Sequence, residues 1–258
     1  MKLTLLGTGT SFGVPVVGCP CAVCASTDPR DKRTRCAALI EQGGRTLLID
    51  TPPELRLQLL AAQVRSVDAV LYTHEHADHV AGIDDLRVFS DREKREVPLY
   101  GSVATIESLR ASHRYIFDDA VTVTAGTSKP RLSLHPLSPG TEATVGGFDI
   151  LPLAFPHGAG EVLGYRIGPV AYLTDVKSVP MASRDQLRGL KLLVLNALWW
   201  RSHPTHLSID EAIAVAQDLG AERTLLTHLT HETGHAELAA QLPRGIEPGY
   251  DGLAVEIR

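Results

Sequence analysis

The segment from His74 to His79 has the pattern H-x-H-x-D-H and follows an apolar run at residues 69–72. Such a run predicts a buried strand, and core packing gives no reason for three imidazoles and a carboxylate at its end. Imidazole nitrogens and carboxylate oxygens are natural ligands of Zn²⁺ and Mn²⁺. The segment therefore predicts a metal centre. Its order indicates two ions, because Asp78 and His79 follow a change of register where a helix begins and can face a second ion.

Further candidate ligands stand at the ends of other strand-like runs, at His157, Asp175 and His228. Because each of them comes at the end of a predicted strand, we expect all of them on one rim of a sheet. The simplest partition assigns His74, His76 and His157 to one ion, and Asp78, His79 and His228 to the other. The two oxygens of Asp175 can bridge the ions, and a carboxylate between two dications stays ionised at any working pH.

With this order of ligands, the chain resembles the metallo-β-lactamase superfamily over its whole length. The resemblance implies an α/β fold, the αββα sandwich of two mixed β-sheets flanked by helices, as a single domain over residues 1–258, with the metals at one edge. It also implies that Asp50, after the apolar run 46–49, orients the metal-binding loop without ligating. The alternative, a set of solvated loop histidines, does not account for the orderly ligands downstream.

A loop with three cysteines indicates which group within this superfamily the chain resembles. Cys19, Cys21 and Cys24 form C-x-C-x-x-C in a loop broken by glycine and proline, one ligand short of a tetrahedral zinc site. The fourth ligand could be His231, if a turn after the preceding strand directs it away from His228. This set resembles the PhnP-type cyclic phosphodiesterase group, which implies a structural zinc held by Cys19, Cys21, Cys24 and His231.

Other interpretations of the cysteines stay open at this point. They could be unrelated reduced thiols, or Cys21 and Cys24 could be a redox pair. The surrounding sequence does not look like the helix start of a thioredoxin-type unit, and three clustered thiols suit a metal better. Cys36 lies outside the motif and is expected to be an ordinary small buried residue.

The same resemblance assigns different roles to the two histidines before the helical pattern at residues 208–216. In the PhnP-like group the histidine just before this helix acts as general acid or leaving-group stabiliser, and His206 matches it. We predict His206 and the ligand Asp78 as the catalytic residues. His203 has no such match and is expected to be exposed. Trp199 and Trp200 are left open as a partner patch, a substrate lip or half-buried core residues.

Together these features predict a dinuclear metal-dependent phosphodiesterase. Its substrate would be a small ester, such as a cyclic ribose phosphate or a nucleotide. Hydroxide generated at the two ions would attack phosphorus while a proton donor assists the leaving oxygen. The expected cofactors are two catalytic divalent ions, Mn or Zn, with manganese implied by the PhnP-like group, and one structural Zn.

A nuclease similar to tRNase Z has the same ligand order and is the first alternative. RNA substrates demand basic surface, because phosphate contacts dominate affinity. The chain carries a net charge of −5 and one short basic run, residues 30–35. A local patch near Arg87, Arg92, Lys94 and Arg95 is not excluded, but exposed helix charges explain it as well. Further alternatives are β-lactamase or thioesterase activity, and a nucleotide-binding protein without turnover.

Length and composition agree with one compact domain. The chain has 258 residues, of which 44% are hydrophobic, and no linker-like tract divides it. Apolar runs fall short of the roughly 20 residues that span a bilayer, and no signal peptide precedes the opening strand. With reduced cysteines, this predicts a cytoplasmic protein. The oligomeric state stays open, a homodimer included.

Local patterns add three structural predictions. Ser208 and Glu211 form a capping box that predicts a helix start. Residues 118–130 predict a surface loop. A division near residue 145 into two strand-rich halves predicts a duplicated architecture.

Overall fold

The strands of the computed structural model, which describes residues 1–122 and 124–258, form two mixed sheets of seven strands each. In the first sheet the order is β14 (Ala254–Glu256), β1 (Lys2–Gly7), β2 (Ala37–Gln42), β3 (Arg45–Ile49), β4 (Ala69–Leu71), β5 (Val97–Gly101), β6 (Leu132–Pro136). In the second it is β13 (Ile246–Pro248), β12 (Arg223–Thr227), β11 (Leu192–Asn196), β10 (Val170–Leu173), β9 (Gly160–Ile167), β8 (Phe148–His157), β7 (Ala143–Val145). The predicted αββα sandwich is confirmed.

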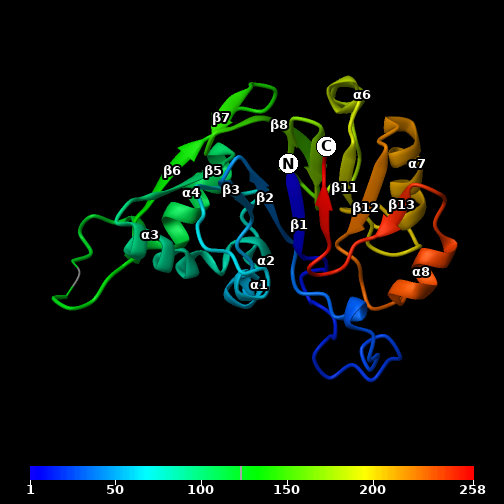
Figure 1. The fold of residues 1–258 in the computed structure, drawn as a ribbon, viewed down its shortest axis with the longest axis horizontal. Helices are drawn as coiled ribbons and strands as arrows, with labels where there is room; N and C mark the ends of the chain where they lie inside the picture. The colour runs from blue at the N-terminus through cyan, green and yellow to red at the C-terminus, as the bar shows by residue number, and fades with distance from the viewer. Residues whose placement is uncertain (123) are drawn as a thin grey trace.

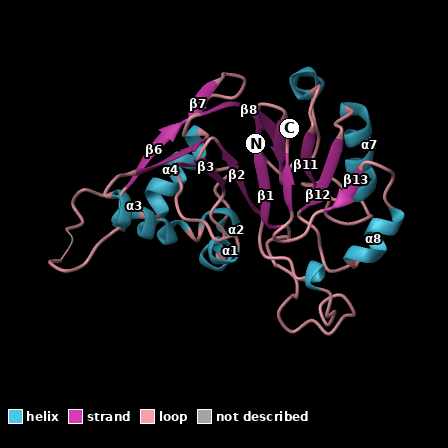
Figure 2. Ribbon diagram, viewed as in Figure 1, coloured by secondary structure: helices cyan, strands magenta, loops and turns pink. Residues whose placement is uncertain are grey.

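Helices cover the outer faces of both sheets (Figures 1 and 2). Those of the first half are α1 (Leu55–Ala61), α2 (Ala77–Val80), α3 (Arg87–Glu93), α4 (Val103–Ser112) and α5 (Arg114–Phe117), with the 3-10 turns Pro29–Asp31 and Ile83–Leu86. Those of the second half are α6 (Met181–Arg184), α7 (Ile209–Leu219) and α8 (His235–Gln241), with the 3-10 turn Asp185–Leu187. Within the described residues, no helix combines the length and the apolar character needed to cross a membrane.

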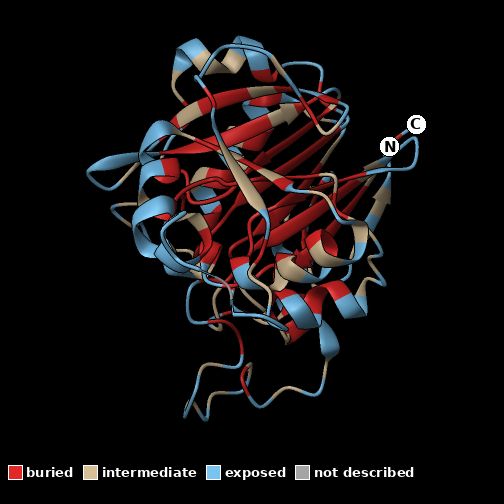
Figure 3. Ribbon diagram, turned by 90° about the vertical axis from the view of Figure 1, so that its left-hand side faces the viewer, coloured by how far each residue is buried: buried red, intermediate tan, exposed pale blue. Residues whose placement is uncertain are grey.

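Central strands are buried on both faces, so successive residues enter different cores (Figure 3). In β3, Leu47 and Ile49 join the core between the two sheets, while Leu48 joins the core under the helices of the first half. In β10, Tyr172 points into the central core and Leu173 into the core under α7. A slip of one residue would exchange these environments, and the two-sided burial therefore fixes the register.

The two halves repeat one pattern. β1, β2 and β3 pair antiparallel, and β3 to β6 pair parallel; β8, β9 and β10 pair antiparallel, and β10 to β13 pair parallel. The change between sheets falls at residues 137–142, slightly before the predicted division near 145, and β14 returns to the first sheet. Parallel neighbours bring several strand carboxyl ends to one edge of the sandwich.

The predicted helix start at Ser208 is confirmed. The Ser208 side chain accepts a hydrogen bond from the backbone of Glu211, whose carboxylate accepts one from the backbone of Ser208. Segments β6, β7 and β13 were not predicted as strands. The predicted loop at 118–130 contains no helix or strand among its described residues, and residue 123 lies outside them.

Candidate metal centre

Three polar residues that follow strand ends adopt the left-handed backbone conformation. Asp50 follows β3 with φ of 63°, Asp175 follows β10 with φ of 60°, and His228 follows β12 with φ of 58°. A residue other than glycine in this region costs of order 1–3 kcal/mol, and such strain clusters at functional sites. The three turns end the strands sharply at the same edge of the sandwich.

The side chains expected to bind metal converge there in two groups. Ligand atoms of His74, His76 and His157 lie within 4.8 Å of one another, and so do those of Asp78, His79 and His228. These are the two groups that the sequence predicted, and residues from both halves of the chain contribute to them. The donor atoms are nitrogen and oxygen only, a set that suits Zn²⁺, Mn²⁺ or Fe²⁺.

Asp175 lies between the two groups. Its Oδ2 is 3.3 Å from Nε2 of His79, and its Oδ1 is 3.1 Å from Nε2 of His228. It also lies within the same 4.8 Å limit of His74 and of His157. The carboxylate therefore has the position of a bridge.

The buried carboxylates at this centre need positive charge nearby to stay ionised. Burial raises the pKa of the Asp175 carboxyl, but nearby His228 and His79 hold that pKa well below its usual value. For the His79 imidazole burial acts in the opposite direction and lowers the pKa, but the carboxylates of Asp175 and Asp50 outweigh it and hold that pKa well above its usual value. At His74 burial prevails and lowers the pKa well below normal, which favours the neutral imidazole, the form that can bind a metal ion. Protons, or divalent cations in their place, satisfy the carboxylates.

Asp50 supports the centre from behind. Its Oδ1 accepts the backbone N–H of Thr73 at 2.8 Å, and its Oδ2 accepts the Thr73 hydroxyl at 2.8 Å and Nδ1–H of His79 at 2.7 Å. With Nδ1 engaged, His79 directs Nε2 toward Asp78 and Asp175, where this buried atom has no hydrogen-bond partner among the described residues. An orphaned ring nitrogen facing two carboxylates fits a cation between them. Sequence reasoning placed Asp50 here but missed Thr73.

His206 reaches the centre from the loop between β11 and α7. Its Nε2 is 2.9 Å from Oδ1 of Asp175, and its ring stacks on His228 with centroids 4.7 Å apart. Burial lowers the pKa of His206. His203, which the sequence led us to expect as exposed, is instead half-buried and has its Nδ1 3.2 Å from Nδ1 of His206.

The two tryptophans whose role the sequence left open are both half-buried. The guanidinium carbon of Arg201 lies 3.7 Å from the ring centre of Trp199, and His203 meets the same ring edge to face. Trp200 packs against the core under α7. Trp199 therefore packs against His203, whose ring in turn packs against that of His206.

A second cluster gathers the three motif cysteines around His231. The Sγ atoms of Cys19, Cys21 and Cys24 lie 3.4, 3.3 and 3.5 Å from Nδ1 of His231. The cysteines belong to the long irregular segment that projects at the bottom of Figure 1 (blue). Three thiols converging on one imidazole nitrogen form a four-donor set, the number that a tetrahedral zinc requires.

Buried Arg33 fixes the backbone on both sides of His231, the histidine of this cluster. Its guanidinium donates to the carbonyl oxygens of Thr230 and Thr233, on either side of His231, and lies 3.5 Å from Asp31. Asp31 in turn accepts the backbone N–H of His235 at 2.6 Å. Arg33 belongs to the short basic run at residues 30–35, and its side chain is fully buried.

We expect the thiols of the metal-free protein to differ sharply in reactivity. Hydrogen bonds from the backbone of Cys24 and from His231 lower the pKa of Cys21 to about 6, whereas burial raises the pKa of Cys36 to about 12. At pH 7 Cys21 is then mostly thiolate, the reactive form, and iodoacetamide should label it far faster than Cys36. The labelling rate of Cys21 should fall as the pH drops below about 6. Peptide mass spectrometry measures both rates, and equal labelling would contradict the expectation.

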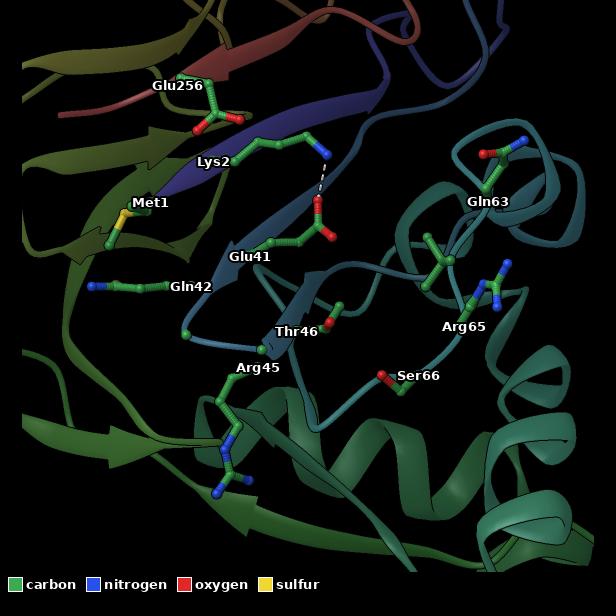
Figure 4. A pocket seen from close by; sticks show the side chains of 13 residues that line it. Met1, Lys2, Glu41, Gln42, Arg45, Thr46, Gln63, Arg65, Ser66 and Glu256 are labelled. Carbon is green, nitrogen blue, oxygen red and sulfur yellow. Dashed lines mark hydrogen bonds and ion pairs between the residues drawn. The ribbon is translucent and has the colours of Figure 1, made fainter.

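A separate surface cavity of about 490 Å³ lies between the start of β1, the β2–β3 turn and the segment after α1 (Figure 4). Its charged lining is partly self-neutralised, since Nζ of Lys2 is 2.7 Å from Oε2 of Glu41. None of the clustered histidines or cysteines lines it. Its lining offers no comparable set of ligand or nucleophilic groups, so the histidine cluster is the stronger functional candidate.

The fold and the two clusters define a protein of the metallo-β-lactamase fold class. Residues 45–229 match the family model described as Beta-lactamase superfamily domain. A crystal structure described as a new diphosphatase from the PhnP family aligns with a TM-score of 0.91 and 40% identity, covering 98% of this chain and 96% of that one. The chain therefore belongs to the metallo-β-lactamase superfamily and, within it, to the PhnP family.

Other relatives carry different names. An octanoyltransferase of Porphyromonas gingivalis is 41% identical over 256 residues, which are 98% of this chain and 51% of that protein. A ribonuclease Z of Mycobacterium sp. (strain KMS) is 26% identical over 294 residues, covering 100% of this chain and 96% of the relative. Zn²⁺-bound PqqB from Methylobacterium extorquens shares the fold, with a TM-score of 0.81 at 19% identity and full coverage of both chains. This chain spans about half the length of the first curated relatives that it matches.

Proposed function

We propose that this chain is a metal-dependent phosphodiesterase that hydrolyses a small substrate, such as a cyclic ribose phosphate or a nucleotide ester. The observation that carries the proposal is the joint position of Asp175 and His206. Asp175 is shared by two groups of ligand atoms, and a histidine outside those groups lies 2.9 Å from it. This arrangement suits phosphoryl chemistry, which needs charge stabilisation on one side and a proton donor on the other.

The proposed cofactors are two divalent ions, Mn or Zn, at the two groups that share Asp175, and a structural Zn at Cys19, Cys21, Cys24 and His231. Bound at the histidine cluster, the two ions would polarise phosphoryl oxygens as Lewis acids and lower the pKa of water. The protein's own part is to hold the ligands in place: Asp50 directs His79, and the carbonyl of Thr205 accepts Nδ1–H of His157 at 3.2 Å.

The two residues predicted as catalytic are assigned different roles. Burial raises the pKa of Asp78, but the nearby imidazole of His79 outweighs burial and the pKa falls to about 2. Such a group is ionised at neutral pH, so we assign Asp78 to the ligand set. His206 carries a hydrogen on the Nε2 that faces Asp175, and we assign it the delivery of a proton to the leaving oxygen.

A second candidate is hydrolysis of a diphosphate linkage. It is favoured by the 40% identity to the protein described as a PhnP-family diphosphatase. The two reactions make similar demands on the site, since both displace an oxygen leaving group from phosphorus. They differ in the leaving group, which is a phosphate in the diphosphate reaction and needs less protonation than an alkoxide.

A tRNase Z-like activity is less favoured, despite the ribonuclease Z relatives. Three of the four basic residues of the suspected patch pair with carboxylates: Arg87 pairs with Asp84, and both Arg92 and Arg95 pair with Glu93. RNA binding depends on unpaired basic surface.

The test is a substrate panel with protein loaded with Mn²⁺ or Zn²⁺. It contains bis(p-nitrophenyl) phosphate, a 2′,3′-cyclic nucleotide, a dinucleotide diphosphate and precursor tRNA. We expect turnover of the first two and loss of activity by about 10³-fold in His76→Ala, since Lewis-acid stabilisation is worth several kcal/mol. Turnover of the diphosphate alone would favour the second candidate. Absence of turnover throughout, with His76→Ala indistinguishable from the parent, would reject both.

A further inference from the structure

Thr205 stands at the meeting point of three histidines in the loop between β11 and α7. Its carbonyl oxygen is 3.2 Å from Nδ1 of His157, and its Oγ1 is 2.8 Å from Nδ1 of His206. Its backbone N–H donates to Nδ1 of His203 at 3.3 Å, and the same ring nitrogen is 3.2 Å from Oγ1. The polar groups of this one residue thus contact all three imidazoles.

The hydrogens in this cluster can be placed by elimination. The ionised carboxylate of Asp175 can only accept, so Nε2 of His206, 2.9 Å away, carries a hydrogen. In the neutral ring Nδ1 of His206 is then an acceptor, and the hydroxyl of Thr205 is its donor. The backbone N–H of Thr205 makes Nδ1 of His203 an acceptor as well. The two Nδ1 atoms, 3.2 Å apart, therefore each depend on Thr205 for a donor.

The backbone of this loop is anchored directly after Thr205. Leu207 donates to the carbonyl of Val176 at 3.0 Å, and Nζ of Lys177 donates to the carbonyl of His206 at 3.3 Å. Lys177 also pairs with Glu211 at 2.9 Å, the residue that caps α7. These contacts fix the position of Thr205, so its side chain can orient the ring of His206.

We propose that Thr205, backed by His203, is the positioning residue for His206. Its hydroxyl donates a hydrogen bond to Nδ1 of His206 and so orients the Nε2 hydrogen toward the region between the two ligand groups. Its carbonyl also sets the ring of His157. The proposal rests on the proton-donor role of His206 in the proposed function. Asp175 would also hold the cations, so its hydrogen bond with Nε2 of His206 would be weaker with metal bound, and the hydrogen bond from Thr205 would be the main contact that orients the ring.

The consequence depends on the leaving group. An alkoxide, such as the ribose oxygen of a cyclic nucleotide, needs a proton as the P–O bond breaks. A p-nitrophenolate does not, because it is stable as an anion at neutral pH. Misplacing His206 should therefore impair the first substrate and spare the second, whereas damage to the ligand set would impair both alike.

The experiment compares Thr205→Val with Thr205→Ser in the metal-loaded full chain. Valine keeps the shape and the backbone groups but removes the hydroxyl, and serine restores it. For a 2′,3′-cyclic nucleotide we expect Thr205→Val to lower kcat by about 10–100-fold, part of the 10²–10⁴-fold that a positioned acid contributes. For bis(p-nitrophenyl) phosphate we expect kcat within about threefold of the parent, because its leaving group needs no acid. Thr205→Ser should stay near the parent on both substrates, and His203→Ala should show the valine pattern more weakly.

Elemental analysis controls for the ligand set, since all variants should bind the same amount of metal. Equal losses on the two substrates, or no loss in Thr205→Val, would overturn the proposal. A readout independent of turnover is the Nε2–H signal of His206 in the ¹H–¹⁵N NMR spectrum of zinc-loaded protein, assigned through its absence in His206→Gln. We expect the signal in the parent and in Thr205→Ser, and its loss through exchange in Thr205→Val. An unchanged signal in Thr205→Val would overturn the proposal even if the parent cleaves no phosphate ester, the result that rejects the proposed function.

Discussion

Asp175→Asn is expected to lower phosphodiester turnover by about 10³-fold or more, since it removes the charge shared by both ligand groups and Lewis-acid stabilisation is worth several kcal/mol. The amide is nearly the same size as the carboxylate. Asparagine also tolerates the left-handed backbone, with φ of 60°, that this position requires. The expected loss therefore reports charge and coordination. Steady-state kinetics and elemental analysis should show lower turnover together with loss of bound divalent metal from the histidine cluster.

Asp68→Asn is the matched control. Its carboxylate accepts a backbone hydrogen bond from Thr46 at 2.8 Å, and it lies directly before β4, away from the histidine cluster. We expect unchanged turnover and metal content in this variant. Parent-like activity and metal binding in Asp175→Asn would show that the shared carboxylate is not needed, contrary to the proposed function.

Cys24→Ala is expected to release the zinc proposed at the cysteine cluster and to expose the projecting segment to trypsin. Residues 11–34 contain only one short 3-10 turn and few buried side chains, so little apolar burial holds the segment in place. The four-donor cluster joins it to His231, 207 positions along the chain from Cys24. Because binding of a structural zinc is folding free energy, its loss should let the segment open locally.

The basic run in this segment supplies the measurement. Trypsin cleaves after arginine, and Arg33 is fully buried in the folded chain. Cleavage there should be at least about tenfold faster in Cys24→Ala, because local opening exposes the bond, and zinc content should fall by about one ion per chain. Cys36→Ala is the control: this thiol is buried near Gly9 and Thr227, so its removal should cost about 1 kcal/mol and leave zinc bound. If Cys24→Ala keeps its zinc and its protease resistance, the cysteine cluster is not a structural metal site.

Central strands were predictable from the sequence, whereas three of the four edge strands, β6, β7 and β13, were not. A central strand such as β10 is buried on both faces and reads as a continuous apolar run. By contrast β6, β7 and β13 are edges of their sheets, pair on one side only and are short. Their residues are partly exposed, and Pro248 in β13 is tolerated because an edge position need not donate to a neighbour. The sequence therefore carries little signal for them.

The groups of candidate ligands were also predictable, for a different reason. Histidine, cysteine and aspartate placed at strand ends have few structural uses, and parallel strands bring their carboxyl ends to one edge. Burial of individual charged residues was not predictable in this way. Arg33 and Arg35 stand in the same basic run, yet only Arg33 is fully enclosed, because its guanidinium meets backbone carbonyls from residues 230 and 233.

By itself the sequence determined which chemical groups this protein brings to its site and in what order, because side-chain identity and short spacings carry that information. Only the tertiary structure decided which of those groups touch. His206 meets Asp175 across 31 positions, and Arg33 meets Thr230 across 197. The role proposed for Thr205, invisible as a single threonine in a loop, follows from such contacts. They depend on how the two sheets pack and on where each strand ends, which no local pattern encodes.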